Sequence, residues 1–480
     1  MSLARIGIRG AFFTSLALAF RQVVSLLATF YVARQLLPSD FGLFSMVMIV
    51  IGFAQVIGDV GIATGLVRSQ KNSATVLSTC FWVGAAIGIV LASAVFILAP
   101  VAGWFYAKEE IEPFLRASAL GMLVNFLTPV PMALLQQRLA YKEIALSQGI
   151  SSLVGAFAAV TLVYAGFGIW GLVFQPIVGN LLTLFMLASY ARWRPTVQFE
   201  FSSAQDILRT GVHLLGSGLT GYLRNNFDTL VIGKALSAKD LGVYGMAQTI
   251  LYAPMHLITS TVSRVMFPLL SKVQDDLEKV RAAVLTATAR TALLVFPLYF
   301  GLVMLADEFV QLVFGPSWLD MVFLIRIMAC SFLIQSIGAV AGPLMLALGK
   351  SKIILRISIG NSVLYFVVLL TLIPYGLTAV AIGYAITNTI IGVFSLGVSL
   401  HFAKIKKKDY MKSIARPFVL ALCMCLVILT LKYFFNSATL VQFVMLVISG
   451  ATVYTVLAFF FEKSAWKQVI SAIGSRIEVE

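Results

Sequence analysis

Two arginines occur in the middle of long apolar segments, where a charged side chain is costly. Arg21 lies near the middle of segment 10–32, and Arg224 lies near the middle of segment 211–232. A charge at bilayer depth costs at least about 2.5 to 3.5 kcal/mol on insertion scales, so both side chains should face protein or water rather than lipid. Because a planar guanidinium fits the oxygens of a phosphate, such a pair favours an anionic, phosphorylated ligand.

The residues around these arginines decide how much positive charge is left for a ligand. Arg224 is followed by Asn225 and, four residues on, by Asp228. Residues four apart meet on one helix face, so Asp228 either neutralises Arg224 and locks the bundle or lies beside it in a binding site. Arg21 has no acidic neighbour in the sequence, and Gln22 beside it adds an amide. Amides such as Gln22 and Asn225 suit a glycan, and they also join helices.

Three more charged residues within apolar segments each have more than one interpretation. Arg326 and Arg264 lie nearer the ends of their segments, so they either contact substrate or extend to the lipid headgroups. Asp59 pairs with an arginine in a cavity, caps a bend before Gly61, or takes part in ion coupling, in that order of preference. Asp228 is the second candidate for ion coupling.

Other chemistries lack the residues that they need. His213, His256 and His401 are far apart and have no neighbouring acidic or sulfur ligands, which argues against a metal site. The sequence contains no GxxxxGK[ST] phosphate loop, so we expect no ATP hydrolysis by that route. A glycan polymerase or ligase would need reactive groups in a sizeable outer loop, and the predicted outer gaps are short and contain no His. We therefore expect a protein that is not an enzyme and has no cofactor.

The composition places these residues in a membrane. Of the 480 residues, 60% are hydrophobic and only 11% are charged, and the mean hydropathy is +0.96. Continuous apolar windows that can cross about 30 Å of hydrocarbon predict an all-α polytopic membrane protein with about fourteen transmembrane helices, rather than a closed barrel. The predicted spans lie near 10–32, 41–65, 76–103, 113–137, 145–166, 168–190, 211–232, 241–270, 285–306, 318–348, 353–373, 376–402, 413–434 and 438–461.

The distribution of positive charge predicts the topology. Of the 35 Lys and Arg residues, we assign 25 to cytoplasmic gaps and ends, 6 to outer gaps and 4 to the membrane. Because positive charge is retained on the cytoplasmic side, both termini are predicted to be cytoplasmic. The densest basic cluster lies at 404–416 and is interpreted as an anchor for anionic lipid headgroups. It lacks the aromatic pattern of a nucleic-acid site, so no nucleic acid is expected as a partner.

The chain repeats itself at an offset of two hundred residues. Identical residues in the two copies are Leu36, Asp40, Gly42 and Met46, which recur as Leu236, Asp240, Gly242 and Met246. The repeat unit is six helices, which predicts six-helix bundles at 1–200 and 201–403, followed by two additional helices and a cytoplasmic tail at 404–480. An even number of helices gives both copies the same orientation, so a pseudo-twofold axis should run along the membrane normal, with a substrate cavity between the halves.

The repeated residues themselves are expected to be structural. Asp40 and Asp240 each lie just after an outer gap, where a carboxylate caps the N-terminus of the following helix and meets the favourable end of its dipole. Gly42 and Gly242 follow two residues later and should permit close packing. No catalysis is needed to explain these four positions.

Three stretches carry a likeness to a known family. Residues 33–44 read ARQLLPSDFGLF, residues 58–68 read GDVGIATGLVR, and residues 224–244 read RNNFDTLVIGKALSAKDLGVY. With these stretches the chain resembles, over essentially its full length, the Wzx-type polysaccharide flippases of the multidrug/oligosaccharidyl-lipid/polysaccharide (MOP) exporter superfamily. The likeness is closest to the colanic-acid and lipopolysaccharide exporter branch.

The resemblance implies a V-shaped cavity between two bundles and transport by alternating access. Its substrate would be an oligosaccharide on undecaprenyl pyrophosphate, moved to the outer leaflet of the bacterial inner membrane for O-antigen, exopolysaccharide or capsule synthesis. The cavity residues that it implies are Arg21, Arg224 and Asp228, with Asp59 less firmly assigned. Partners would be the bilayer, a polysaccharide polymerase and a chain-length protein, and the chain would function as a monomer.

Neither the energy source nor the substrate class is fixed by these patterns. Export of an anion is favoured by a negative interior, by about 2.3 kcal/mol per charge per 100 mV, and H⁺ or Na⁺ antiport is the alternative. A drug or metabolite antiporter of the same superfamily and a lipid II flippase for cell-wall synthesis are the rival functions, and a membrane glycan polymerase or ligase ranks below them.

Overall fold

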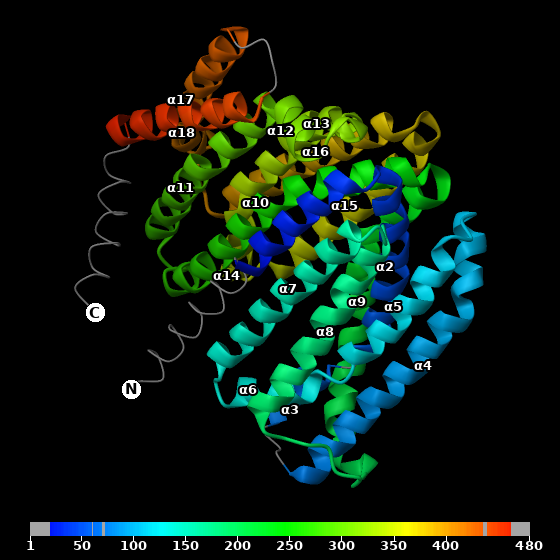
Figure 1. Cartoon of the computed structure of the whole chain (residues 1–480). Helices are drawn as coiled ribbons and strands as arrows, with labels where there is room; N and C mark the ends of the chain where they lie inside the picture. The colour runs from blue at the N-terminus through cyan, green and yellow to red at the C-terminus, as the bar shows by residue number, and fades with distance from the viewer. Residues whose placement is uncertain (1–19, 60, 70–72, 435–438, 462–480) are drawn as a thin grey trace. The chain divides into compact units, whose positions relative to one another are not determined.

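The computed structural model describes residues 20–59, 61–69, 73–434 and 439–461 (Figure 1). All regular secondary structure in this part of the chain is helical, as the sequence predicts. Contacts divide the chain into two compact units, Met1–Gly245 and Met246–Glu480. The boundary falls inside a helix, because α10 extends from Ala238 to Lys272. The boundaries at 200 and 403, which follow from the sequence duplication, remain predictions.

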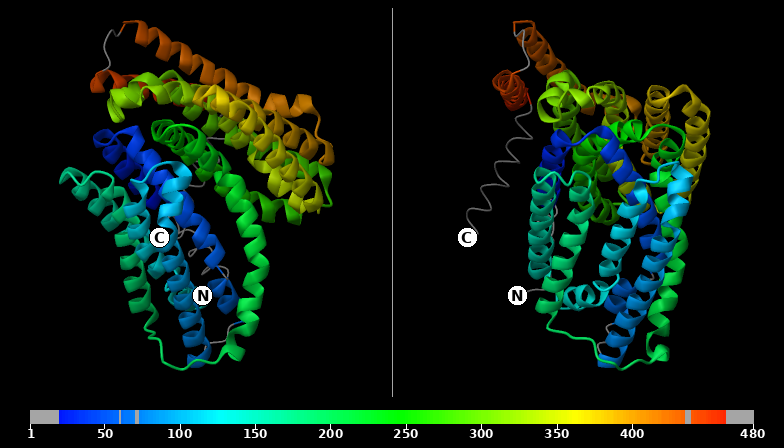
Figure 2. Two further views of the ribbon diagram at one scale, coloured as in Figure 1. Left: turned by 90° about the vertical axis from the view of Figure 1, so that its right-hand side faces the viewer. Right: turned by 45° about the vertical axis from the view of Figure 1, so that its right-hand side comes forward.

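The first unit begins with a helix over residues 20–35, which is the described part of the first predicted span. It continues with α2 (Pro38–Gly58), α3 (Ile62–Ser69), α4 (Ala74–Tyr106), α5 (Ile111–Asn125), α6 (Pro129–Gln137), α7 (Tyr141–Tyr164), α8 (Trp170–Ala191), α9 (Phe201–Ala235) and the start of α10. Helix α7 packs along α8, α8 packs against α5, and α5 packs against α4 (Figure 1, Figure 2). Helix α9 packs against α2, α3 and α4.

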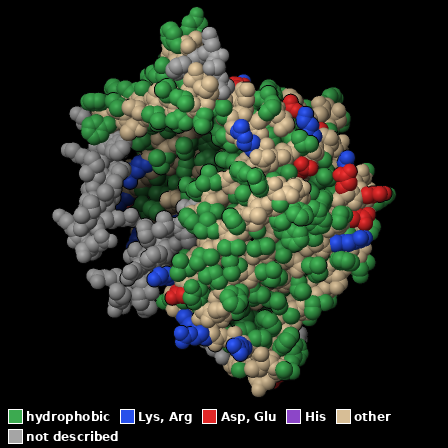
Figure 3. Space-filling model, in the orientation of Figure 1, with side chains coloured by type: hydrophobic (Ala, Val, Ile, Leu, Met, Phe, Trp, Pro, Cys, Tyr) green, Lys and Arg blue, Asp and Glu red, His purple; other side chains and the backbone are tan. Residues whose placement is uncertain are grey.

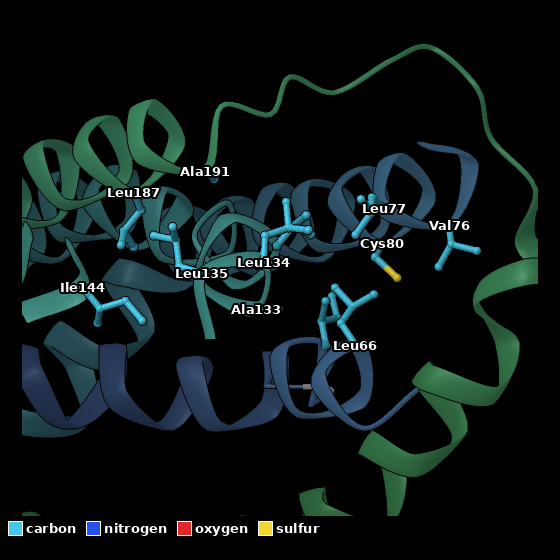
Figure 4. Close-up of a cluster of buried hydrophobic side chains, with 12 residues drawn as sticks. Leu66, Val76, Leu77, Cys80, Ala133, Leu134, Leu135, Ile144, Leu187 and Ala191 are labelled. Atoms are coloured by element: carbon cyan, nitrogen blue, oxygen red, sulfur yellow. The ribbon is translucent and has the colours of Figure 1, made fainter. Parts of the chain in front are cut away.

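A buried apolar cluster joins the ends of five helices in this unit (Figure 4). It contains Leu66 of α3, Cys80 of α4, Leu135 of α6, Ile144 of α7 and Leu187 of α8. Leu66, Cys80 and Leu187 are fully buried. Because interiors are close-packed, this cluster fixes the short helices α3 and α6 against the long ones.

The described residues of the second unit form the rest of α10 and eight further α-helices. They are α11 (Leu277–Met304), α12 (Ala306–Val313), α13 (Asp320–Ile337), α14 (Ala341–Ala347), α15 (Ser351–Leu372), α16 (Leu377–Phe402), α17 (Lys407–Phe434) and α18 (Leu440–Phe461). Helix α13 packs against α16, which also packs against α15, and α11 packs against α17. Lys432 of α17 forms an ion pair with Glu308 of α12 at 2.7 Å and donates to the carbonyl of Met304 at 3.0 Å. These contacts tie the short helix α12 to its neighbours.

Eleven helical stretches of the described residues are long and apolar enough to cross a membrane. They correspond to eleven of the fourteen predicted spans, so the chain is a multi-pass membrane protein, whereas the count of fourteen is not confirmed. The first span lies partly outside the described residues. The other two are α9 and α10, of 35 residues each. Both are long enough, but α9 carries Arg224 and Asp228 and α10 carries Arg264, so neither is a simple lipid-facing helix.

Three of the predicted spans are each broken into two helices. The break between α2 and α3 lies at 59–61, where Gly61 has a φ of +61°. The break between α5 and α6 precedes Pro129, and the one between α13 and α14 is a 3₁₀ turn at Gly338–Val340. Hydropathy alone does not detect these breaks, because apolar residues continue across them.

The surface of the first unit is that of a membrane protein. In the view of Figure 3, hydrophobic side chains cover most of the visible surface of α4 to α8, and charged side chains gather toward the helix ends. Exposed apolar residues such as Ile97, Phe157 and Phe185 are each 70 to 72% exposed on these helices. In water such a surface would drive association, whereas hydrocarbon matches it.

The two repeated aspartates cap their helices, as predicted. An Asp40 carboxylate oxygen accepts the backbone N–H of Leu37 at 2.9 Å. The equivalent Asp240 oxygen accepts the N–H of Ser237 at 3.2 Å and its hydroxyl at 2.6 Å. A carboxylate at this position satisfies a backbone donor that the helix leaves unpaired.

The two repeated glycines bring the starts of α2 and α10 into backbone contact. A Cβ added to Gly42 would overlap the carbonyl oxygen of Ala238, and one added to Gly242 would overlap the carbonyl oxygen of Pro38. The contact is therefore reciprocal, with each glycine facing the helix start of the other copy. The expected close packing occurs between the two hairpins rather than within each one.

We expect Gly42→Ala and Gly242→Ala to destabilise the protein, because the new methyl group has to push apart two backbones. Overpacking of this kind costs roughly 1 to 3 kcal/mol. The matched control is Gly245→Ala on the same helix as Gly242, where the added Cβ would lie 3.7 Å from the Ser45 hydroxyl. Thermal melting of the purified protein in detergent distinguishes them, and equal melting temperatures for all three variants would contradict the contact.

Candidate functional site

Arg224 lies on an open polar stripe of α9. Gly216, Thr220, Arg224 and Asp228 follow one another at intervals of four, so they share one side of the helix. Gly216, Thr220 and Arg224 are exposed, and a Cβ added to Gly216 would meet no atom within 4 Å. Asn225 is exposed beside Arg224. Since this side of α9 is polar and open, it suits contact with water or a polar ligand rather than lipid.

Tyr222 fixes the orientation of this stripe. Its hydroxyl donates to the carbonyl of Ile49 in α2 at 2.8 Å, and its ring covers Gly52, where no side chain would fit. Two residues along an α-helix correspond to a rotation of about 200°, so Arg224 faces away from α2. The packing of Tyr222 thus turns the arginine outward from the core of the first unit.

Asp228 at the end of the stripe is buried and held by hydrogen bonds. It is 4% exposed, and one carboxylate oxygen accepts the hydroxyl of Tyr244 at 2.8 Å. The other accepts the backbone N–H of Thr229 at 2.8 Å. Tyr244 belongs to α10 and is fully buried, so the pair joins the two helices of the hairpin. This geometry gives Asp228 a structural task, and its predicted roles in substrate binding and ion coupling remain untested.

Arg21 lies where the packed side of the first described helix becomes uncovered. It shares that side with Ala28 and Val32, which are seven and eleven residues further on and are 7% and 1% exposed. Arg21 itself and Gln22 are exposed. A guanidinium on the protein side of a helix, beyond the point where packing ends, is accessible to water or a ligand.

The remaining predicted residues belong to other helices or to the break between α2 and α3. Asp59 is exposed at the break between α2 and α3 and accepts the N–H of Gly61 at 3.1 Å, which is the geometry of the bend-capping interpretation. Arg326 forms an ion pair with Asp307 of α12. Arg264 is exposed on α10. Within the first unit, the structure thus places Arg224, Asn225 and Asp228 together on α9.

Several polar or aromatic features escaped the sequence analysis. Tyr252 and His256, one turn apart on α10, are both exposed and stack with ring centroids 5.8 Å apart. A pocket in the second unit is lined by amides and hydroxyls. In both cases the sequence contains polar residues at helical spacing. A search for long apolar segments does not detect them. Among the described residues, no cluster of three or more His, Cys, Asp or Glu side chains could hold a metal ion.

A larger cavity of about 400 Å³ lies among α2, α4 and α9 in the first unit. Its lining is almost entirely apolar and includes Phe53, Phe105 and Phe227. Asn226 and the two tyrosines Tyr106 and Tyr222 are its polar members. Such a lining suits hydrocarbon rather than phosphate, so the cavity is not a site for the charged part of a ligand.

Comparison with known proteins identifies the family. The profile of a family described as "Polysaccharide biosynthesis protein" matches residues 31–323, which is more than half of the chain. The chain belongs to this family. The predicted membership of the polysaccharide exporter group is thereby confirmed.

Relatives over nearly the full length have related names. The chain is 27% identical over 434 residues to the lipopolysaccharide biosynthesis protein WzxC of Escherichia coli (strain K12), covering 88% of this chain and 87% of that one. It is 26% identical over 451 residues to the succinoglycan biosynthesis transport protein ExoT of Rhizobium meliloti (strain 1021), covering 92% and 91%. ExoT is named as a transport protein, which agrees with the prediction that the chain is not an enzyme.

Solved structures show the same fold. The lipid II flippase MurJ in an inward closed conformation matches with a TM-score of 0.76 at 16% identity, covering 95% of this chain and 100% of that one. An inward-facing multidrug transporter of the MATE family, within the MOP superfamily, matches with a TM-score of 0.62 at 16% identity, covering 80% and 94%. The fold is therefore that of MOP transporters.

We expect Tyr244→Phe to lower the free energy of unfolding, because it removes a donor from the buried Asp228 carboxylate. A hydrogen bond to a charged group contributes about 1.5 to 3 kcal/mol. Tyr31→Phe is the control, since Tyr31 is 40% exposed in the same unit. Denaturation of the purified protein measures both, and a Tyr244→Phe variant as stable as Tyr31→Phe would contradict the inferred role of the pair.

Proposed function

We propose that this chain is a flippase for a lipid-linked oligosaccharide. It carries an undecaprenyl-pyrophosphate-linked glycan from the cytoplasmic to the outer leaflet of the bacterial inner membrane by alternating access. The product serves the synthesis of a surface polysaccharide. The family membership, the relatives' names and the transporter fold support this function, and the observation that carries it is the open polar stripe of α9 with Arg224 at its centre.

The proposed substrate has three parts with different solvation needs. The pyrophosphate is anionic and binds Arg224 and Arg21, both of which are exposed. Asn225 and Gln22 supply amides for adjacent hydroxyl groups. The polyprenyl chain remains in the bilayer, because its transfer to water would cost about 25 cal/mol per Å² of apolar surface. The arginines thus act on the part of the substrate that lipid cannot solvate.

The membrane potential is a sufficient energy source in principle. Outward movement of a negatively charged head is favoured by about 2.3 kcal/mol per charge per 100 mV when the interior is negative. Antiport of H⁺ or Na⁺, with Asp228 or Asp59 as carrier, is the alternative. Flipping measured in proteoliposomes with voltage, pH and Na⁺ gradients imposed separately distinguishes these sources.

The termini are proposed to be cytoplasmic, and a polymerase and a chain-length protein are proposed to act on the product.

Two rival substrates fit the same fold. A drug antiporter would export cationic dyes, and cations are repelled by the Arg224 stripe. A lipid II flippase would rescue cells that lack their peptidoglycan flippase. The family match favours a polysaccharide precursor over both, and assays of dye efflux and of rescue test the rivals directly.

We expect Arg224→Ala to reduce flipping of a lipid-linked glycan in proteoliposomes by about tenfold to a hundredfold, because a charge-assisted contact contributes about 1.5 to 3 kcal/mol. Arg224→Lys should also be impaired, since an ammonium lacks the two-point geometry of a guanidinium.

The control for these variants is Lys279→Ala, which removes the same charge from an exposed pair with Asp276 at the start of α11. It should flip as the wild type does. Unchanged transport by Arg224→Ala, at equal amounts of inserted protein, would exclude Arg224 from substrate binding.

A further inference from the structure

A polar pocket of about 250 Å³ lies within the second unit, among α13, α14, α15 and α16. Five polar side chains line it, one from α13 and two each from α15 and α16, namely Gln335, Ser358, Asn361, Asn388 and Ser395. At roughly 30 Å³ per water molecule the volume holds about eight waters, and so one ring-sized polar molecule. The arginine candidates are not among the lining residues, so this is a separate site.

The polar residues reach the pocket because of their spacing. Ser358 and Asn361 are three apart on α15, and Asn388 and Ser395 are seven apart on α16, so each pair lies on one helix face. Helices α15 and α16 pack together, and α16 also packs against α13 and α14. Isolated polar residues between helices commonly bond to one another. Here they also surround a space.

Two of the amides have buried atoms without partners. The side-chain nitrogen of Gln335, a donor, and the side-chain oxygen of Asn361, an acceptor, are buried and make no hydrogen bond within the described structure. Asn388 uses its side-chain nitrogen on the carbonyl of Tyr384 at 3.0 Å. Buried polar groups are rarely left unpaired, so an unpaired donor and an unpaired acceptor on two residues that line one pocket indicate a missing partner. A hydroxyl group can accept from one and donate to the other.

The charge of the pocket selects among ligands. None of its lining residues, all of which belong to the described part of the chain, is acidic or basic. A phosphate or a bare cation would therefore be buried there without a compensating charge. A neutral molecule with several hydroxyl groups avoids this cost. The apolar part of the lining, which includes Met345, Ile357 and Ile391, can cover the C–H faces of a ring.

The predicted topology puts the pocket on the side where substrate is loaded. Helices α14 and α15 meet at Gly349 and Lys350, in a predicted cytoplasmic gap. Met345 and Ile354 lie within about one to two turns of that gap, and both line the pocket.

We propose that this pocket binds one neutral sugar ring of the lipid-linked glycan while the pyrophosphate is held elsewhere. The proposal rests on the flippase function proposed above. It gives the second unit a glycan-recognition site that is distinct from the arginines of the first, and it makes the identity of one sugar a determinant of specificity.

The test compares glycosylated with bare lipid carriers. The full-length protein in nanodiscs is titrated with undecaprenyl pyrophosphate alone and with the same lipid bearing one glucose, one galactose or one N-acetylglucosamine. The wild type should bind at least one glycosylated lipid about tenfold more tightly than the bare lipid, because a site built for hydroxyl groups rejects a ligand that lacks them. Asn361→Leu and Gln335→Met should abolish this preference and leave the affinity for the bare lipid unchanged.

Ser362→Ala is the matched control, since Ser362 neighbours Asn361, bonds to the carbonyl of Ser358 at 3.0 Å and does not line the pocket. It should keep the preference, and melting temperatures establish that each variant is folded. A sugar preference that survives in both pocket variants would overturn the site, as would a wild type without preference. If Na⁺ alone raised the melting temperature of the wild type but not of either pocket variant, the pocket would be a cation site instead. Failure of the wild type to bind any of the four lipids would overturn the proposed flippase function as well.

Discussion

A formal charge is not stable in hydrocarbon unless protein or water covers it. Helix α9 is long enough to cross a membrane, but it is not among the apolar spans. Because it carries charged residues, it cannot be surrounded by lipid on all sides. Tyr222 anchors one side of α9 to α2, and Asp228 joins the helix to Tyr244 of α10. The side that is left carries Arg224. The same logic applies to Arg21, which lies on the packed side of its helix but is itself uncovered. Both arginines are thus exposed, and the proposed function assigns them to the anionic headgroup.

The sequence duplication also produces a contact between the two repeat-related hairpins. Gly42 and Gly242 bring the starts of two repeat-related helices into reciprocal backbone contact, and Asp40 and Asp240 cap those starts. Because glycine has no side chain, the two helix backbones can approach closely at these positions. The contact therefore holds the two helix starts together. The first helix of each repeat precedes this contact and carries one of the two arginines. The two arginines and the glycine contact therefore belong to the same pair of helical hairpins.

The sequence was sufficient for features that depend on local pattern. Continuous apolar runs predicted the helical class, and the positions of Asp40 and Asp240 after their gaps predicted helix caps. It was insufficient where packing decides. Asp59 and Gly61 indicated a bend as one of three interpretations, but the breaks before Pro129 and at Gly338–Val340 lie inside apolar runs and were not predicted.

The candidate site was predictable only in part, for the same reason. Asp228 was placed beside Arg224 by spacing, but the sequence did not predict that the buried Tyr244 of α10 also donates a hydrogen bond to the Asp228 carboxylate. The unpaired amide atoms of Gln335 and Asn361 belong to two different helices, α13 and α15, so no pattern along one helix joins them. Position along one helix is readable from the sequence. Contact between helices is not.

The central claim is that Arg21 and Arg224 face water at membrane depth. It is tested by replacing each with Cys, in a chain whose native Cys80, Cys330, Cys423 and Cys425 are changed to Ser or Ala, and measuring reaction with a membrane-impermeant thiol reagent. Val367→Cys, at an exposed apolar position of α15, is the lipid-facing reference. The account predicts that Cys at positions 21 and 224 reacts quickly and is protected by undecaprenyl pyrophosphate. Reaction no faster than at position 367 would contradict it.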